Sequence, residues 1–137
     1  MKDVSSSKVI SGDDCSYAIG TNQQVCVTVK DVQFKCRENF MGTGYEKCTV
    51  DVDYFLDTDY RDKPINVDIR CEAKVSYETR NSIIASRKYG DETASHFMYS
   101  YQEFGNLSII VKLFDFDDVI KAQLSSVECK INYIFAY

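Results

Sequence analysis

The chain has 137 residues, of which 16 are Lys or Arg and 21 are Asp or Glu, giving a formal net charge of −5. Such an acidic chain lacks the basic surface of a nucleic-acid-binding protein, so we expect no nucleic-acid partner. No apolar run approaches the roughly 20 residues of a transmembrane helix, so we expect no transmembrane segment. The length fits a single domain of roughly 100–150 residues.

Residues 1–14 are polar, Ser-rich and without hydrophobic periodicity. They predict a flexible tail or linker, followed by one domain over residues 15–137. The first residues also lack the apolar stretch of a signal peptide. If the protein is exported, we therefore expect this chain to be the mature form without its signal peptide. If it is also anchored, residues 1–14 would be the tether.

Apolar residues recur with a period of two from Val25 onward, which predicts β-strands. The apolar phase shifts at Lys30-Asp31, which predicts a β-bulge or a strand that changes sheets. Residues 37–47 contain two glycines and are predicted to form a loop. Two strands with one buried and one polar face are then predicted over residues 48–56 and 65–77.

The second half of the chain has a weaker pattern. Residues 79–95 are predicted to be irregular, with a helical turn around 83–88, and alternation at 97–101 predicts a strand. A turn is expected at Gly105-Asn106, followed by a strand over 107–113 and a short capped turn at 119–122. A closing strand is predicted to face the core with Val127, Cys129, Ile131, Tyr133 and Phe135.

About seven strands at regular spacing, with no sustained helical period, predict an all-β fold. The favoured architecture is a single antiparallel β-sandwich of immunoglobulin-like arrangement, stapled by disulfides. A closed β-barrel is the alternative.

The six cysteines are spread along the chain without any C-x-x-C pair, which argues against zinc ribbons and thioredoxin-like redox sites. An even number of dispersed cysteines indicates disulfides and an oxidising compartment, so we predict a secreted or periplasmic protein. The alternative is a cytoplasmic protein with six free thiols. We favour the pairs Cys36–Cys48, which closes a hairpin, Cys71–Cys129, which joins distant strands, and Cys15–Cys26, which pins the tail.

The sequence contains no catalytic motif, and its only histidine is His96. We therefore predict a protein that is not an enzyme and that has no cofactor. Acidic residues between 51 and 62 and near 117 are weak candidates for a calcium site, since calcium prefers several oxygen ligands in a flexible loop. The metal candidates are Asp51, Asp53, Asp57, Asp59 and Asp117.

Aromatic residues gather in and beside the irregular segment 79–105. Tyr and Phe are enriched at the centres of protein interfaces, so they form a candidate binding surface. Its members are Tyr89, Phe97, Tyr99, Tyr101 and Phe104.

We therefore expect an exported module that binds a protein or other envelope macromolecule, of adhesin, inhibitor, immunity or secretion-accessory type. A small-ligand or lipid carrier with a cavity between the sheets is one alternative. A calcium-assisted enzyme or calcium-binding module on the acidic loops is the other.

Overall fold

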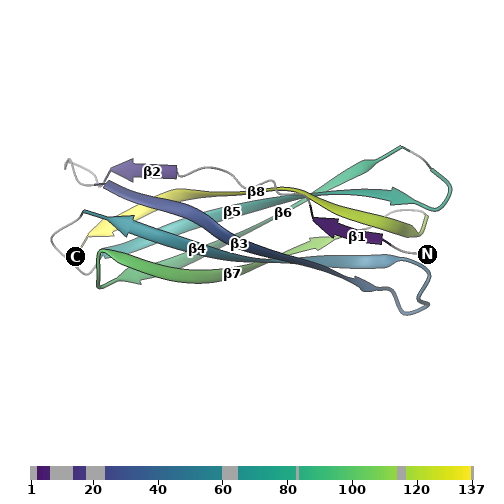
Figure 1. Ribbon diagram of the computed structural model, residues 1–137, viewed down its shortest axis with the longest axis horizontal. Helices are drawn as coiled ribbons and strands as arrows, with labels where there is room; N and C mark the ends of the chain where they lie inside the picture. The colour runs from purple at the N-terminus through teal and green to yellow at the C-terminus, as the bar shows by residue number, and fades with distance from the viewer. Residues whose placement is uncertain are drawn as a thin grey trace.

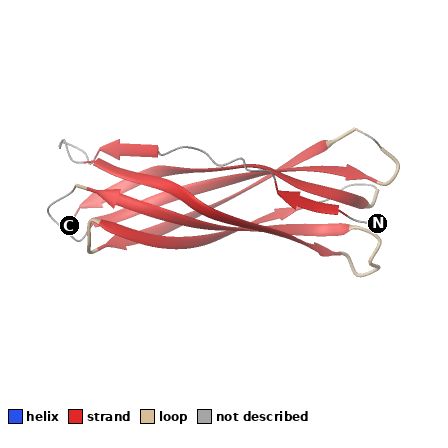
Figure 2. Cartoon of the chain, viewed as in Figure 1, coloured by secondary structure: helices blue, strands red, loops and turns tan. Residues whose placement is uncertain are grey.

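A computed structural model describes residues 3–6, 14–17, 24–59, 65–82, 84–113 and 117–136. The described chain is built of long β-strands that run the length of an elongated molecule (Figures 1 and 2). The eight strands are β1 (Asp3–Ser6), β2 (Asp14–Tyr17), β3 (Gln24–Glu38), β4 (Tyr45–Thr58), β5 (Ile65–Thr79), β6 (Ser86–Met98), β7 (Gln102–Lys112) and β8 (Val119–Ala136).

The strands divide into two hydrogen-bonded sheets, with the orders β1-β8-β5-β6 and β2-β3-β4-β7. The seven strands β2 to β8 pair antiparallel, and the short β1 adds to β8 in parallel. The predicted sandwich is therefore confirmed in preference to a closed barrel. Asp3–Ser6 and Asp14, which fall in the expected tail, lie in strands, while the rest of residues 1–14 lies outside the described residues.

The core lies between the two sheets and follows from the alternation of side chains along each strand. In β5, every second residue from Ile65 to Thr79 is buried and the residues between are at least partly exposed. The opposite sheet contributes residues such as Leu56 and Ile109, which are completely buried. Each such aliphatic side chain stabilises the fold by roughly 1.5–3 kcal/mol.

The predicted shift of phase in the first long strand is a β-bulge. The pairing of β3 with β4 changes register between Val29 and Asp31. Because one extra residue reverses the direction of all later side chains, Val32 packs against the same core as Val29.

Two predictions for residues 79–101 are wrong. Residues 86–88, expected in a helical turn, begin strand β6, while residue 83 lies outside the described residues. The β6 strand is an edge strand with exposed residues on both faces, so it lacks the alternation that reveals a buried strand. The strand expected through 97–101 ends at Met98, and residues 99–101 form the turn to β7.

Gly105-Asn106, expected as a turn, lies inside β7. The ring of Tyr54 on β4 lies directly against Gly105, and a Cβ there would overlap the ring. The glycine is thus explained by this close approach rather than by a turn.

The last strand is longer than predicted and differs in its inward face. It begins at Val119, so the expected turn at 119–122 is wrong. Its pairing with β5 shifts register between Asp68 and Ile69, where Ile131 and Tyr133 are successive partners. Ile131 packs against the core as predicted, but Tyr133 and Phe135 are exposed, at 49% and 43%.

All three predicted disulfides are present: Cys15–Cys26, Cys36–Cys48 and Cys71–Cys129. Each joins residues that are direct cross-strand neighbours, so each lies within one sheet and none joins the two sheets. Cys48, Cys71 and Cys129 are buried, as expected from their strand phase, whereas Cys36, expected on a buried face too, is only partly buried.

We expect the stabilisation from these disulfides to follow the length of chain that they close. The residues of Cys71–Cys129 are 58 apart and those of Cys36–Cys48 are 12 apart. The C71A/C129A variant should lose about 4 kcal/mol of unfolding free energy, and C36A/C48A about 3 kcal/mol. Urea unfolding of both variants measures this difference, and a larger loss for C36A/C48A would contradict it.

Candidate functional site

Exposed aromatic side chains concentrate at one end of the sandwich. Figure 1 shows that this end holds the β6–β7 turn and the last residues of β4 and β8. We call this group the aromatic end. Its exposed or half-exposed members are Tyr17, Phe55, Phe97, Tyr99, Tyr101, Phe104, Tyr133 and Phe135.

The aromatic end covers the turn and continues over the outer faces of both sheets. On one sheet, Phe55 of β4 pairs directly with Phe104 of β7, with ring centroids 5.0 Å apart. On the other sheet, Phe97 and Phe135 both pair with Asn66 of β5, one from each side. Tyr133 lies beside Phe135, with ring centroids 4.4 Å apart.

Four of the five predicted surface residues belong to this end and the fifth does not. Tyr99 and Phe104 are 72% and 71% exposed, and Phe97 and Tyr101 lie on the same turn region. Tyr89 is also exposed, but it lies eight residues before Phe97 on β6, about 26 Å along the strand at 3.3 Å per residue.

Four members of the aromatic end were not predicted as surface residues from the sequence: Tyr17, Phe55, Tyr133 and Phe135. The alternation of apolar residues along β4 places Tyr54 inward and therefore Phe55 outward, so the exposure of Phe55 was predictable from the sequence. For Tyr133 and Phe135 the decisive feature is the bulge in the pairing of β8 with β5, which the alternation within β8 does not reveal.

A chain of hydrogen bonds beneath the aromatic end fixes the β6–β7 turn. The Oη atom of Tyr54 lies 3.1 Å from Nδ1 of His96, and Nε2 of His96 lies 2.9 Å from Oε1 of Glu103. The other oxygen of Glu103 accepts hydrogen bonds from the amides of Tyr99 and Ser100, at 2.6 and 2.9 Å. Glu103 therefore connects the interior of the sandwich to the turn that carries Tyr99 and Tyr101.

The surroundings of these groups affect their protonation. Burial tends to raise the pKa of Glu103, but hydrogen bonds from His96, Ser100 and Tyr99 together lower it below its ordinary value. Burial raises the pKa of Tyr54, so its hydroxyl stays protonated at neutral pH. His96 and Glu103 are residue types used in acid–base chemistry, but here their polar atoms are directed at one another and at the turn.

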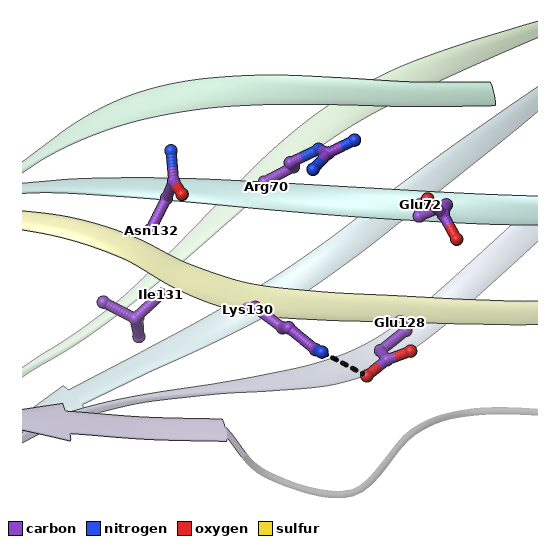
Figure 3. A pocket seen from close by; sticks show the side chains of 6 residues that line it. All are labelled: Arg70, Glu72, Glu128, Lys130, Ile131 and Asn132. Carbon is purple, nitrogen blue, oxygen red and sulfur yellow. Dashed lines mark ion pairs between the residues drawn. The ribbon is translucent and has the colours of Figure 1, made fainter.

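A shallow depression lies on the outer face of the sheet formed by β5, β6 and β8 (Figure 3). Its volume of about 200 Å³ is below the roughly 300 Å³ of the smallest usual ligand pockets. Its charges are largely paired: Lys130 lies 3.3 Å from Glu128, and Arg70 binds Asp91. The lining residues are Arg70, Glu72, Glu128, Lys130, Ile131 and Asn132.

The structure does not bring the acidic metal candidates together. Asp51 and Asp53 lie on the outer face of β4 and accept hydrogen bonds from Ser108 and Asn106. Asp57 and Asp59 line a depression near the end of β4. Asp117 lies at the opposite end of the sandwich, just before β8. Within the described residues, no group of three or more His, Cys, Asp or Glu is placed to hold a metal ion.

Asp117 instead has a local role in the β7–β8 connection. It accepts hydrogen bonds from the amides of Asn81 and Asp118, at 2.7 and 2.9 Å. These bonds, that of Asn81 above all, hold its pKa below the ordinary value.

Comparison of the chain with protein-family models, curated proteins and solved structures finds no match.

We expect the contribution of Glu103 to stability to depend on pH. Because its folded-state pKa is lowered, the stabilisation is present above the unfolded-state pKa and is lost as pH falls through the folded-state pKa. The loss of unfolding free energy in Glu103→Gln should therefore be larger at neutral pH than near pH 3, which lies below the ordinary pKa of a Glu side chain, about 4.3. Urea unfolding of the wild-type protein and the variant at both pH values measures this loss.

The exposed Glu72 offers a matched control, because Glu72→Gln removes a carboxylate from a strand face without touching the turn. An equal effect of Glu103→Gln at both pH values would contradict the proposed role of the carboxylate.

Proposed function

We propose that this protein is a non-enzymatic, exported module that binds another macromolecule through its aromatic end. The observation that carries the proposal is the concentration of exposed Tyr and Phe side chains at that end. Exposed apolar side chains gathered in this number, rather than scattered singly, mark interaction sites on soluble proteins. Tyr and Phe supply much contact area and have few rotatable bonds to immobilise.

The rigidity of the turn supports the same proposal. Glu103 accepts both turn amides, so Tyr99 and Tyr101 are held on a fixed backbone before any partner arrives. Preorganisation of this kind reduces the entropic cost of binding.

The rim of the aromatic end indicates the chemistry of the partner. Asp57, Asp59 and Asp68 lie near it, while Lys30 lies with its Nζ atom 5.3 Å from the ring centre of Phe55. A partner surface with an apolar centre and basic groups around it would be complementary. Adhesin, inhibitor, immunity and secretion-accessory roles would each use such a surface.

The apolar core between the sheets favours surface binding over the carrier alternative. The side chains between the sheets, including Leu56, Ile69 and Ile109, are completely buried and pack as one core. A carrier would need a cavity of a few hundred Å³ between the sheets. The scattered acidic residues likewise give the calcium alternative less support than the aromatic end gives to macromolecular binding.

The three disulfides support export, because disulfides persist in oxidising compartments. The described part of the chain contains no membrane-spanning helix. A secreted or periplasmic protein fits the disulfides.

We predict that alanine substitution at the turn weakens partner binding. The partner is first captured from the envelope fraction of the source organism on the immobilised folded protein. The Y99A/Y101A variant should then raise the Kd for that partner about 30-fold, because losing about 1 kcal/mol at each of two interface aromatics removes about 2 kcal/mol of binding free energy.

Tyr89→Ala is the matched control, because it also removes an exposed tyrosine side chain. Tyr89 is 60% exposed but lies away from the aromatic end. It should leave the Kd unchanged. Equal weakening by Tyr89→Ala, or unchanged binding by Y99A/Y101A, would contradict the proposal.

We also predict that the protein from its native compartment contains no free thiol. Mass measurement after alkylation without reductant should show no added label, because all six cysteines are paired. Labelling at all six cysteines would overturn the proposed export.

A further inference from the structure

The β3–β4 connection lies at the end of the sandwich opposite the aromatic end (Figure 1), and two of its apolar side chains are exposed. Phe40 is 101% exposed and Met41 is 76% exposed. Ile84 of the β5–β6 connection, at the same end, is also 76% exposed. We call Phe40 and Met41 the loop tip.

The backbone that carries the loop tip is held by many hydrogen bonds. The amide of Asn39 donates to the carbonyl of Gly44 at 2.7 Å, and the amide of Gly42 donates to the carbonyl of Asn39 at 3.0 Å. Gly42 has a φ of 69°, a conformation that glycine adopts readily. The side chain of Asn39 accepts from the amide of Thr43 at 3.1 Å.

Two further contacts attach the loop to the rest of the sandwich. The hydroxyl of Thr43 donates to Asp118 at 3.1 Å, and Arg80 donates to the carbonyl of Thr43 at 3.0 Å. The loop is therefore braced by residues before β8 and after β5. Exposed apolar side chains on a loop that is held in place in this way indicate contact with another molecule or surface.

Basic side chains lie on the outer face of the sheet next to this loop. Lys47 of β4 has Arg37 of β3 as its neighbour on one side and Lys112 of β7 on the other. Like charges directly opposite one another on a sheet are destabilising, and the chain as a whole is acidic. Lys35 lies two residues before Arg37 on β3 and on the same face. We call these four residues the basic patch: Lys35, Arg37, Lys47 and Lys112.

The carboxylates near the patch bind other groups than its three lysines. Arg37 pairs with Glu46, and Asp118 is engaged with Thr43 and lies 3.8 Å from Arg80. Glu38 lies at the base of the loop, beside Gly42. In the described part of the chain, no carboxylate forms an ion pair with the three lysines of the patch.

We propose that this end of the sandwich docks on an anionic lipid bilayer, with the loop tip inserted among the headgroups and the basic patch facing their negative charge. Apolar side chains at the boundary of the acyl chains combined with basic groups near the surface are the general requirement for interfacial binding. A protein partner would be expected to meet a broader apolar surface, such as the one at the opposite end. Docked in this way, the protein presents its aromatic end away from the membrane.

The test is cosedimentation of the whole protein with vesicles of phosphatidylcholine alone or with about 30% phosphatidylglycerol, at roughly 0.1 M salt. The wild-type protein should sediment with the anionic vesicles and much less with the neutral ones. F40S/M41S should weaken binding to the anionic vesicles about tenfold or more, because it removes the inserted apolar side chains. K47Q/K112Q should also weaken it about 25-fold, since each of the two basic side chains near the surface contributes roughly fivefold.

Tyr89→Ser is the control, because it removes an exposed aromatic side chain from the other sheet, and it should leave vesicle binding unchanged. Circular dichroism and thermal melting establish that each variant is folded. No sedimentation of the wild-type protein, equal binding to neutral vesicles, or full binding by F40S/M41S would each overturn the proposal. A dimer in sedimentation velocity that F40S/M41S abolishes would overturn it too, because a second copy would then cover the loop tip.

Discussion

The structure depends on one constraint, which is that successive side chains of a β-strand point to opposite faces and that one face of each sheet must be buried. In β5 this alternation holds without interruption from Ile65 to Thr79. Wherever a bulge inserts a residue, the alternation reverses, and with it the identity of the exposed side chains. The bulge between Val29 and Asp31 in β3 keeps the side chain of Val32 directed at the core. The bulge in the pairing of β8 with β5 directs the ring of Tyr133 to solvent instead.

The same constraint explains what the sequence could predict. Strict alternation in β4 and β5 predicted their buried faces, including Cys48 and Cys71, and alternation in β8 did the same for Cys129. This placement favoured two of the three disulfides that the structure contains. Strand β6 lies at a sheet edge and is polar on both faces, so a single sequence does not reveal it. The outward direction of Tyr133 is fixed by the register with β5, which is a property of two strands and not of one.

The candidate surface was predictable only in its local part. Phe97, Tyr99, Tyr101 and Phe104 are close in sequence, so their clustering follows from a hairpin turn. The approach of Phe55 and Phe135 from other strands requires the tertiary fold. The hydrogen bonds beneath the β6–β7 turn include one local contact and one that depends on the tertiary fold. Glu103 is close in sequence to Ser100, whose amide it accepts, but the Tyr54 hydroxyl that contacts His96 comes from the opposite sheet.

The placement of the disulfides within sheets has a consequence for folding. The unfolded but oxidised chain already holds Cys71 beside Cys129, and so keeps the centres of β5 and β8 together. That contact is the one most distant in sequence among the three covalent links, and its closure would otherwise be entropically slow. Each disulfide fixes the pairing register of one pair of strands before the oxidised chain refolds. Refolding then requires that hydrogen bonding spread along these strand pairs and that the two sheets pack through their apolar faces. The disulfides thus act on the speed of folding within each sheet, while the association of the sheets is left to the hydrophobic effect.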